Sequence, residues 1–139
     1  MARLTVLMGA PGSGKSTYAK TLGNVVTNDA RGRAPGDILH DSYRQINQLL
    51  SQGKDVVFDT TGANPAVRKA ALSIARRYGA QASVCVMDTP LDLCLAAQRG
   101  RQRPVSGSEV SRIHADVRRQ LRGLQREGFS NVRINRDRR

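Results

Sequence analysis

Glycine, lysine and hydroxyl residues near the start of the chain have the types and spacing of a loop that binds phosphate groups. Residues 9–17 read GAPGSGKST and fit the pattern G-x-x-x-x-G-K-[ST] at every fixed position. The glycines let the backbone turn its amides inward, so that N–H groups and the start of the next helix face the phosphates. Lys15 places a charge on the β- and γ-phosphates, and the Ser16 hydroxyl can enter the shell of a magnesium ion. The stretch predicts a site for ATP, or another nucleoside triphosphate, with Mg²⁺, and its predicted contacts are Gly9, Pro11, Gly12, Ser13, Gly14, Lys15, Ser16 and Thr17.

Two aspartates follow predicted strands and are candidates for chemistry at the acceptor. Asp29 comes just after a strand predicted over 24–27, and Asp59 ends a strand predicted over 54–59. Open α/β sheets bind ligands at the carboxyl ends of their strands, so we expect both carboxylates near the phosphate loop. There Asp29 could accept a proton from an attacking hydroxyl, and Asp59 could lie beside the magnesium ion or, with Thr60, beside the incoming hydroxyl. An Asx turn at Asp29 and a structural cap at Asp59 are the alternatives.

Three arginines, Arg99, Arg101 and Arg103, gather after a helix predicted beyond the fourth strand. An arginine on a mobile segment can close over a nucleotide and offset charge on the transferring phosphoryl group. The alternative is a solvated charged loop. We expect an arginine-rich lid here, with Arg99 and Arg103 as its nucleotide contacts.

These candidates are positioned by an alternation of short apolar runs with longer stretches of helical periodicity. That alternation is typical of a parallel sheet with crossover helices. We expect an α/β fold: a P-loop NTPase-type parallel sheet of about five strands, with helices on both faces and the arginine-rich lid. A chain of 139 residues without a repeat or linker is expected to form a single domain, 1–139. The predicted strands cover 4–8, 24–27, 54–59, 82–87 and 131–134, and helices are predicted over 15–22, 37–52, 65–78 and 90–100 and from 108 through 121.

Charge is the strongest signal in the composition. Lysine and arginine number 23 against 11 acidic residues, a formal net charge of +12. A surface of this sign attracts polyanions, although a merely solvated face is the alternative. Residues 101–139 carry eleven arginines against four carboxylates. This last quarter is where we expect a nucleic-acid footprint.

Cysteine usage and the apolar runs indicate the compartment. Cys85 and Cys94 lie in apolar surroundings without metal-binding spacing, so we expect buried, inert thiols. The chain opens on a strand, and no apolar run there is long enough for a signal peptide or membrane span. We therefore expect a cytoplasmic protein without a membrane partner.

Taken together, the motifs resemble the kinase domain of phage polynucleotide 5′-kinases, from Arg3 to about Val117. The resemblance rests on residues 9–17, on Asn28-Asp29, on residues 59–65 (DTTGANP), and on Arg99 with Arg103 four residues later. It implies a nucleic acid 5′ end as partner. It also implies that Lys15 and Ser16 bind the phosphates and magnesium, and that Asp29 is the general base toward the 5′-hydroxyl. Asp59 would help to place the acceptor, and the lid arginine maps best onto Arg103 and next onto Arg99.

One departure from the family concerns the acceptor. The family usually has an arginine three residues after the base, which grips the acceptor phosphate, and this chain has Gly32 there. Its neighbours Arg31 and Arg33 are the candidates to replace it. Members often carry a phosphatase domain as well, for which this chain has no room, so we expect no phosphatase activity.

The sequence therefore predicts in-line transfer of the γ-phosphoryl group of ATP to a hydroxyl. Asp29 would deprotonate the acceptor, while Lys15, magnesium and Arg103 stabilise charge on the transferring group. The 5′-hydroxyl of DNA or RNA is the leading acceptor. A kinase of a small hydroxylated molecule or a hydroxymethylated DNA base, and a nucleotide-dependent nucleic-acid-binding module, stay open. Neither the choice of DNA or RNA nor the oligomeric state follows from the residues.

Overall fold

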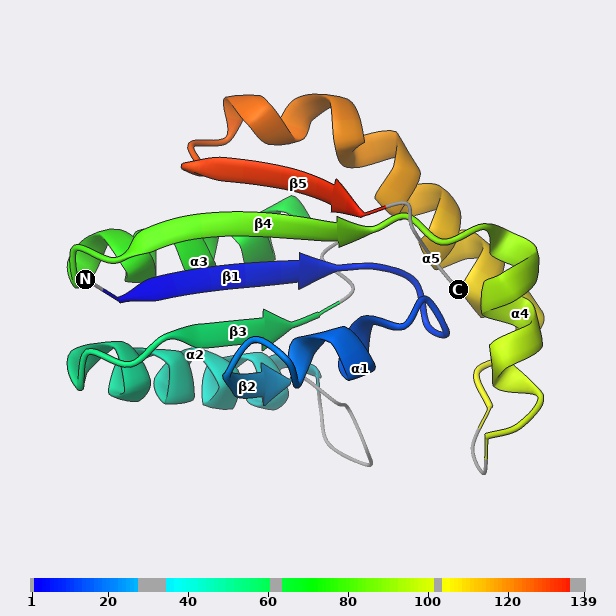
Figure 1. Cartoon of the computed structure of the whole chain (residues 1–139), viewed down its shortest axis with the longest axis horizontal. Coiled ribbons are helices and arrows are strands. Elements are labelled where there is room, and N and C mark those ends of the chain that lie inside the picture. Colours follow the sequence, from blue (N-terminus) through cyan, green and yellow to red (C-terminus); the bar gives the residue numbers. More distant parts are fainter. Residues whose placement is uncertain (1, 28–34, 61–63, 102–103, 136–139) are drawn as a thin grey trace.

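Five parallel strands form one sheet with the order β2-β3-β1-β4-β5 (Figure 1). The computed structural model describes residues 2–27, 35–60, 64–101 and 104–135. Strand β1 is central, and Leu4 lies opposite Val56 of β3 and Ala82 of β4. The predicted α/β sheet of about five parallel strands is confirmed. The strands are β1 (Arg3–Met8), β2 (Asn24–Thr27), β3 (Val56–Asp59), β4 (Gln81–Met87) and β5 (Asn131–Asn135).

Helices cover both faces of the sheet, unequally. On one face Leu4, Val6 and Met8 of β1 join a large apolar core with residues of α2, α3, α5 and η1. On the other face Leu7, Val57 and Cys85 pack with Ala19 of the short α1 in a smaller core. The elements are α1 (Lys15–Ala19), α2 (Pro35–Ser51), α3 (Pro65–Arg77), α4 (Leu91–Gln98), α5 (Gly107–Gln120) and the 3-10 helix η1 (Leu121–Arg126).

Local signals in the sequence set the ends of α3. The Asn64 Oδ1 accepts a hydrogen bond from the Ala66 amide at 3.0 Å, and Pro65 occupies the first turn, as the sequence predicts. Gly79 follows the helix with φ of 64°, the left-handed conformation that glycine adopts readily.

The region after α5 differs from the sequence prediction. The helix expected to include Leu121 ends at Gln120, and η1 follows it. In a 3-10 helix, residues three apart lie on the same side. Leu121 and Leu124 therefore both pack against the large core, where Leu124 is fully buried. This turn brings the chain back to β5.

The carboxyl ends of the strands carry the residues of interest. The phosphate loop follows β1, Asp59 ends β3, and Asp88 follows β4. Strands β3 and β4 lie on opposite sides of β1, so the strand order reverses next to β1. Open α/β sheets bind ligands at the carboxyl ends of the strands at such a point. Within the described residues, no helix is long and apolar enough to cross a membrane.

Candidate active site

A single carboxylate joins the two residues that the loop motif assigns to phosphate and metal. The Lys15 Nζ donates to the Asp59 Oδ1 at 2.8 Å, and the Ser16 Oγ donates to the Asp59 Oδ2 at 3.1 Å. Asp59 is only 6% exposed, because it ends strand β3 beneath the loop. The structure thus brings Asp59 to Lys15 and Ser16, which lie 44 and 43 residues away from it in the sequence but at the same sheet edge.

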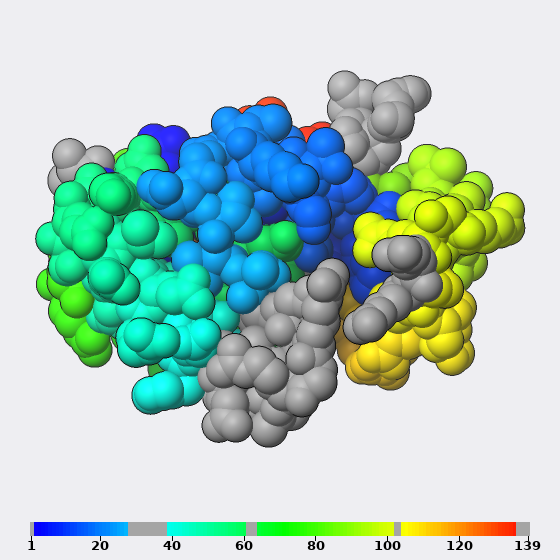
Figure 2. Space-filling model, turned by 90° about the horizontal axis from the view of Figure 1, so that it is seen from below, coloured from blue at the N-terminus to red at the C-terminus, as the bar shows by residue number. Residues whose placement is uncertain are grey.

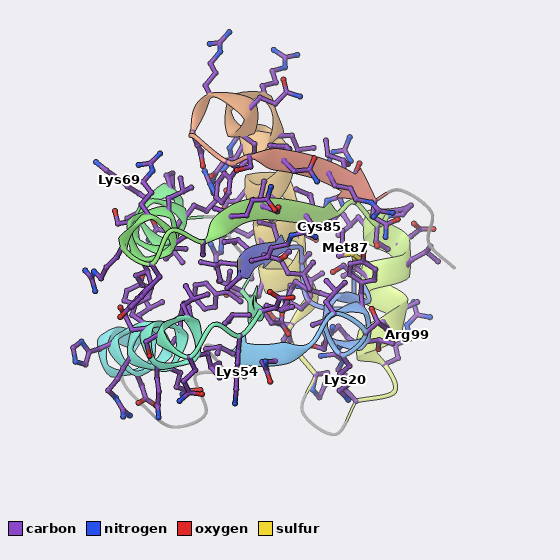
Figure 3. All side chains as sticks on the ribbon, turned by 60° about the vertical axis from the view of Figure 1, so that its left-hand side comes forward. Lys20, Lys54, Lys69, Cys85, Met87 and Arg99 are labelled. Carbon is purple, nitrogen blue, oxygen red and sulfur yellow. The ribbon has the colours of Figure 1, made fainter. Side chains whose placement is uncertain are left out.

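A cavity of about 170 Å³ lies over the loop and marks where phosphates would sit. Its wall includes Arg101. This arginine belongs to the predicted lid but is not one of the two predicted nucleotide contacts. Arg99, a predicted nucleotide contact, is exposed at the end of α4 (Figure 3). It is not among the residues that line the cavity. Arg103 lies outside the described residues. The lining residues are Ala10, Pro11, Gly12, Gly14, Lys15, Ser16, Thr17 and Arg101.

Two of the predicted contacts, Gly9 and Ser13, are not among the residues that line this cavity. Both are buried, and a Cβ added to Gly9 would come within 2.7 Å of the Ser13 Oγ. Gly9 thus leaves room for the Ser13 side chain, and the phosphate contacts of both residues stay predictions.

The loop is packed tightly against α4. Gly12 has φ of 85°, and a Cβ built on it would lie 2.5 Å from the Cys94 carbonyl oxygen and 3.1 Å from the Ala97 Cβ. The space-filling view shows the blue loop segment beside the yellow-green end of α4 (Figure 2). Gly12 is therefore required both for its backbone conformation and for the close approach of a helix. Gly14, with φ of 88°, precedes α1.

A chain of hydrogen bonds through Thr89, which precedes α4, supports the loop from the side of α5. The Thr89 Oγ1 donates to the Ser13 carbonyl at 2.8 Å. The Thr89 carbonyl in turn lies 2.8 Å from the His114 Nε2, which donates because a carbonyl can only accept. Beside it, the Arg118 guanidinium binds Asp88 at 2.6 Å. Asp88 thus anchors α5, and no sequence signal identifies these long-range contacts.

The residues present fit a magnesium ion. Mg²⁺ prefers oxygen ligands and usually takes one or two carboxylates together with substrate phosphates. The Ser16 hydroxyl and the Asp59 carboxylate supply such oxygens at the mouth of the loop. No cluster of three or more acidic, histidine or cysteine residues among those described could hold a metal by itself.

The predicted acceptor residues are the part of the site that stays a prediction. Asp29, Arg31 and Arg33 lie outside the described residues. Thr60 is 3% exposed, and its amide donates to the Leu7 carbonyl at 3.2 Å, so the residue is held within the sheet edge. The side chain of Asp59, by contrast, is bonded to Lys15 and Ser16 of the phosphate loop.

The two cysteines are free and buried, as the sequence predicts. Burial raises the pKa of the Cys85 thiol, which Arg133 and Tyr18 partly offset. Burial and the nearby Asp92 both raise the pKa of Cys94. Neutral thiols are packing residues here rather than nucleophiles or metal ligands.

Comparison with known proteins identifies the family and the fold. A family model described as an AAA domain (AAA_33) matches residues 4–127. No curated protein sequence matches the chain. The solved structure of Chaetomium thermophilum Kti12 in complex with ADP-AlF3 is similar with a TM-score of 0.75 and 16% identity, over 96% of this chain and 88% of that chain. A candidate kinase from Chloroflexus aurantiacus has a TM-score of 0.72 and 12% identity, over 97% and 85%.

A third similar structure is part of a complex named Pnkp1/Rnl/Hen1. Its TM-score is 0.59 with 24% identity, over 76% of this chain and 41% of that chain. At these identities the likenesses show a common fold, an α/β P-loop NTPase fold. The family model covers most of the chain, because residues 4–127 include the phosphate loop, Asp59 and Arg101. The chain therefore belongs to the AAA domain family.

Proposed function

We propose that the chain is an ATP-dependent phosphotransferase that moves the γ-phosphoryl group to a hydroxyl. The observation that carries the proposal is the bonding of Lys15 and Ser16 to one buried carboxylate, that of Asp59, beside a cavity bordered by Arg101. A kinase needs little covalent chemistry from its protein and depends on positioning and on charges around the phosphates. These side chains supply both.

Each residue has a defined task in this account. Lys15 neutralises charge on the β- and γ-phosphates, and Arg101 offers a second cation from the α4 side of the cavity. Asp59 holds Lys15 in place before the nucleotide binds. Ser16 and Asp59 would hold Mg²⁺, which supplies further neutralisation of phosphate charge. The proton acceptor for the attacking hydroxyl is assigned to Asp29 on its position after β2, and Arg103 remains a candidate second lid arginine.

The proposed acceptor is the 5′-hydroxyl of DNA or RNA. The net charge of +12 favours a polyanionic substrate. The motif resemblance to polynucleotide 5′-kinases supports it, as does the structural likeness to a chain of the Pnkp1/Rnl/Hen1 complex. The likeness to Kti12 bound to ADP-AlF3 supports the nucleotide half of the proposal.

An acceptor panel tests the proposal. The protein is incubated with γ-labelled ATP, Mg²⁺ and, in separate reactions, 5′-hydroxyl DNA, 5′-hydroxyl RNA, mononucleosides and sugars. Label on the oligonucleotides supports the proposed acceptor, and label on small molecules alone replaces it with a small-molecule kinase. ATP hydrolysis without label on any acceptor contradicts the kinase function and favours a nucleotide-dependent binding module.

The assignment of the base has its own test. Asp29→Asn removes the proton acceptor while keeping the side-chain size, so transfer should fall by about a hundredfold or more, while ATP binding changes little. Retained transfer in this variant would show that another group takes the proton.

A further inference from the structure

A basic hollow lies on the outer surface of α5 and η1, away from the phosphate loop. It has a volume of about 560 Å³ and is lined by His114, Ala115, Arg118, Arg119 and Arg122. The described lining contains three arginines and no acidic residue. We call this feature the α5 hollow.

The arginines of the α5 hollow keep donors available for a ligand. Arg118 pairs with Asp88 and Arg119 with Asp116, yet their side chains remain 55% and 69% exposed. A guanidinium has five N–H donors, so one carboxylate leaves several of them facing solvent. Arg122 has no carboxylate partner within the described parts of the chain. The hollow therefore presents positive charge with unused, forked hydrogen-bond donors.

The hollow is held at a fixed position relative to the nucleotide site. His114 and Arg118 lie one turn apart on α5 and bind the consecutive residues Thr89 and Asp88. Thr89 in turn donates to the Ser13 carbonyl in the phosphate loop. Figure 1 shows α5 starting at the carboxyl ends of the strands and η1 continuing over β5. A ligand that occupies the hollow would thus be aligned with a substrate at the loop.

The chemistry of the lining favours phosphate groups on a strand rather than a lipid surface. Arginine forks match phosphate oxygens in a bidentate manner. A helix that binds a membrane needs large apolar side chains beside its basic ones. The exposed large apolar residues among those described are Leu22, Val25, Tyr78 and Leu93, and none of them lies on α5 or η1.

We propose that the α5 hollow binds the phosphate backbone of the acceptor nucleic acid, at nucleotides beyond the end that receives the phosphoryl group. This inference rests on the proposed function, since it gives the polynucleotide acceptor a second contact with the protein. It also explains how a chain could prefer long acceptors over mononucleosides.

Binding of a labelled oligonucleotide without ATP tests the hollow directly. The probe is a single-stranded 5′-hydroxyl DNA of about 16 nucleotides, and its fluorescence anisotropy is followed between about 50 and 200 mM NaCl. For Arg119→Ala/Arg122→Ala we expect a Kd raised about tenfold at the lower salt. The slope of log K against log salt should become shallower by about 1.4, because each phosphate contact on a single strand contributes about 0.7. Arg122→Lys, which keeps the charge, should retain most of the slope.

A matched control removes the same charge elsewhere. Arg44 on α2 forms an i,i+3 pair with Asp41 and is 68% exposed, much like Arg119 with Asp116, and Arg77 on α3 binds Asn47. Arg44→Ala/Arg77→Ala should leave the affinity and the salt slope close to those of the unmodified protein. Equal losses in the two double variants would overturn the proposal, because they would reflect net charge alone. Unchanged binding in Arg119→Ala/Arg122→Ala would overturn it as well.

Two further readouts separate this inference from the proposed function and from a membrane role. In the transfer assay, the ratio of the KM for the oligonucleotide to that for a mononucleoside should rise in Arg119→Ala/Arg122→Ala. If no acceptor is phosphorylated while the binding difference stands, the kinase function fails and the site remains. If this variant loses binding to phosphatidylserine vesicles but keeps its affinity for DNA, the hollow is a lipid site and the proposal is wrong.

Discussion

At the scale of single residues, Asp59 is the group on which the proposed site depends most. Its two carboxylate oxygens bind different partners, Lys15 and Ser16. Replacing the carboxylate by an amide would leave the Lys15 ammonium without its counter-charge and remove an oxygen ligand suited to Mg²⁺. In the proposed site, Asp59 would thus link nucleotide binding to metal binding.

Asp59→Asn is expected to weaken Mg²⁺-dependent ATP binding by roughly 10- to 100-fold, the usual effect of disturbing a metal site or its supporting groups. Isothermal titration with ATP, with and without Mg²⁺, measures it. Asp55→Asn is the matched control, since Asp55 is an exposed carboxylate beside β3 that accepts from the Arg3 amide. Equal affinities for the two variants would remove Asp59 from the nucleotide site.

Gly12 allows a second test of the loop. A glycine is needed there both for its left-handed backbone conformation and for the close approach of α4, and these two effects can be separated. Gly12→Ala places a methyl group 2.5 Å from the Cys94 carbonyl and also forces alanine into a left-handed conformation. Gly79→Ala imposes the same kind of conformation where nothing lies within 4 Å. Each should lower the free energy of unfolding by about 1–2 kcal/mol through backbone conformation. Only Gly12→Ala should also lower ATP affinity, which thermal melts and ATP titrations check together.

Equal losses of ATP affinity in the two variants would contradict the packing argument for Gly12. If Gly79→Ala lost as much ATP affinity as Gly12→Ala, the effect would arise from lower global stability. The contact between the loop and α4 would then make no contribution to ATP affinity.

The positions of the phosphate loop and of Asp59 in the fold could be predicted from the sequence, because both follow from local patterns. The motif of residues 9–17 and the placement of Asp59 at a strand end follow from pattern and from the geometry of parallel sheets. The place of Arg101 in the cavity wall could not be predicted, because alternate arginines after a helix look equivalent in the sequence.

At the scale of elements, the junction between α3 and η1 is held by an ion pair inside the protein. Arg68, 1% exposed, donates to both oxygens of Glu127 at 2.8 and 2.7 Å. The pair fixes the end of η1 and so the path of the chain into β5. A buried arginine in α3 gives no sign in the sequence that its partner lies 59 residues away.

Glu127→Ala should lower the free energy of unfolding by about 3 kcal/mol, since it takes the carboxylate from a buried guanidinium. Urea denaturation measures the change. Glu109→Ala removes a carboxylate from an exposed i,i+3 pair with Arg112 and should cost less than about 0.5 kcal/mol. Similar values for the two variants would contradict a structural role for the Arg68–Glu127 pair.

The helices also show which sequence signals are sufficient to predict where a helix begins or ends. Asn64-Pro65 predicted the start of α3 because the cap is made by residues adjacent in sequence. The end of α5 was missed because tertiary packing decides it: Leu124 must reach the core before the chain returns to β5. The bonds from α5 to Asp88 and Thr89 are of the same kind, since they join turns and helices distant in sequence.

At the scale of the whole molecule, the buried thiols make stability depend on pH. Burial raises the pKa of Cys85 and of Cys94 above the ordinary value of 9.0. The folded state therefore favours the neutral thiols, and this stabilisation is complete below the unfolded pKa and is lost as the pH rises through the higher folded pKa. Burial raises the pKa of Tyr43 as well, with the same sign.

The free energy of unfolding should consequently fall from about pH 8 to about pH 10.5, as measured by urea denaturation. The fall should be smaller in Cys85→Ala/Cys94→Ala, which keeps Tyr43 but has no thiol to ionise. Parallel curves for this variant and the unmodified protein would show that the thiols do not contribute.

The organisation of the molecule supports a transfer reaction between two substrates. The phosphate loop and Asp59 lie at the carboxyl edge of a five-stranded sheet, and the α5 hollow lies on the adjoining helix. The whole chain carries a formal net charge of +12. In the proposed reaction the polynucleotide acceptor would be the second, anionic substrate.

The fate of the γ-phosphoryl group tests this account most directly. In a single turnover with γ-labelled ATP, Mg²⁺ and excess 5′-hydroxyl oligonucleotide, we expect most of the label on the oligonucleotide and little as inorganic phosphate. Release of the label as inorganic phosphate, at the same rate with and without the oligonucleotide, would contradict the proposed phosphotransferase.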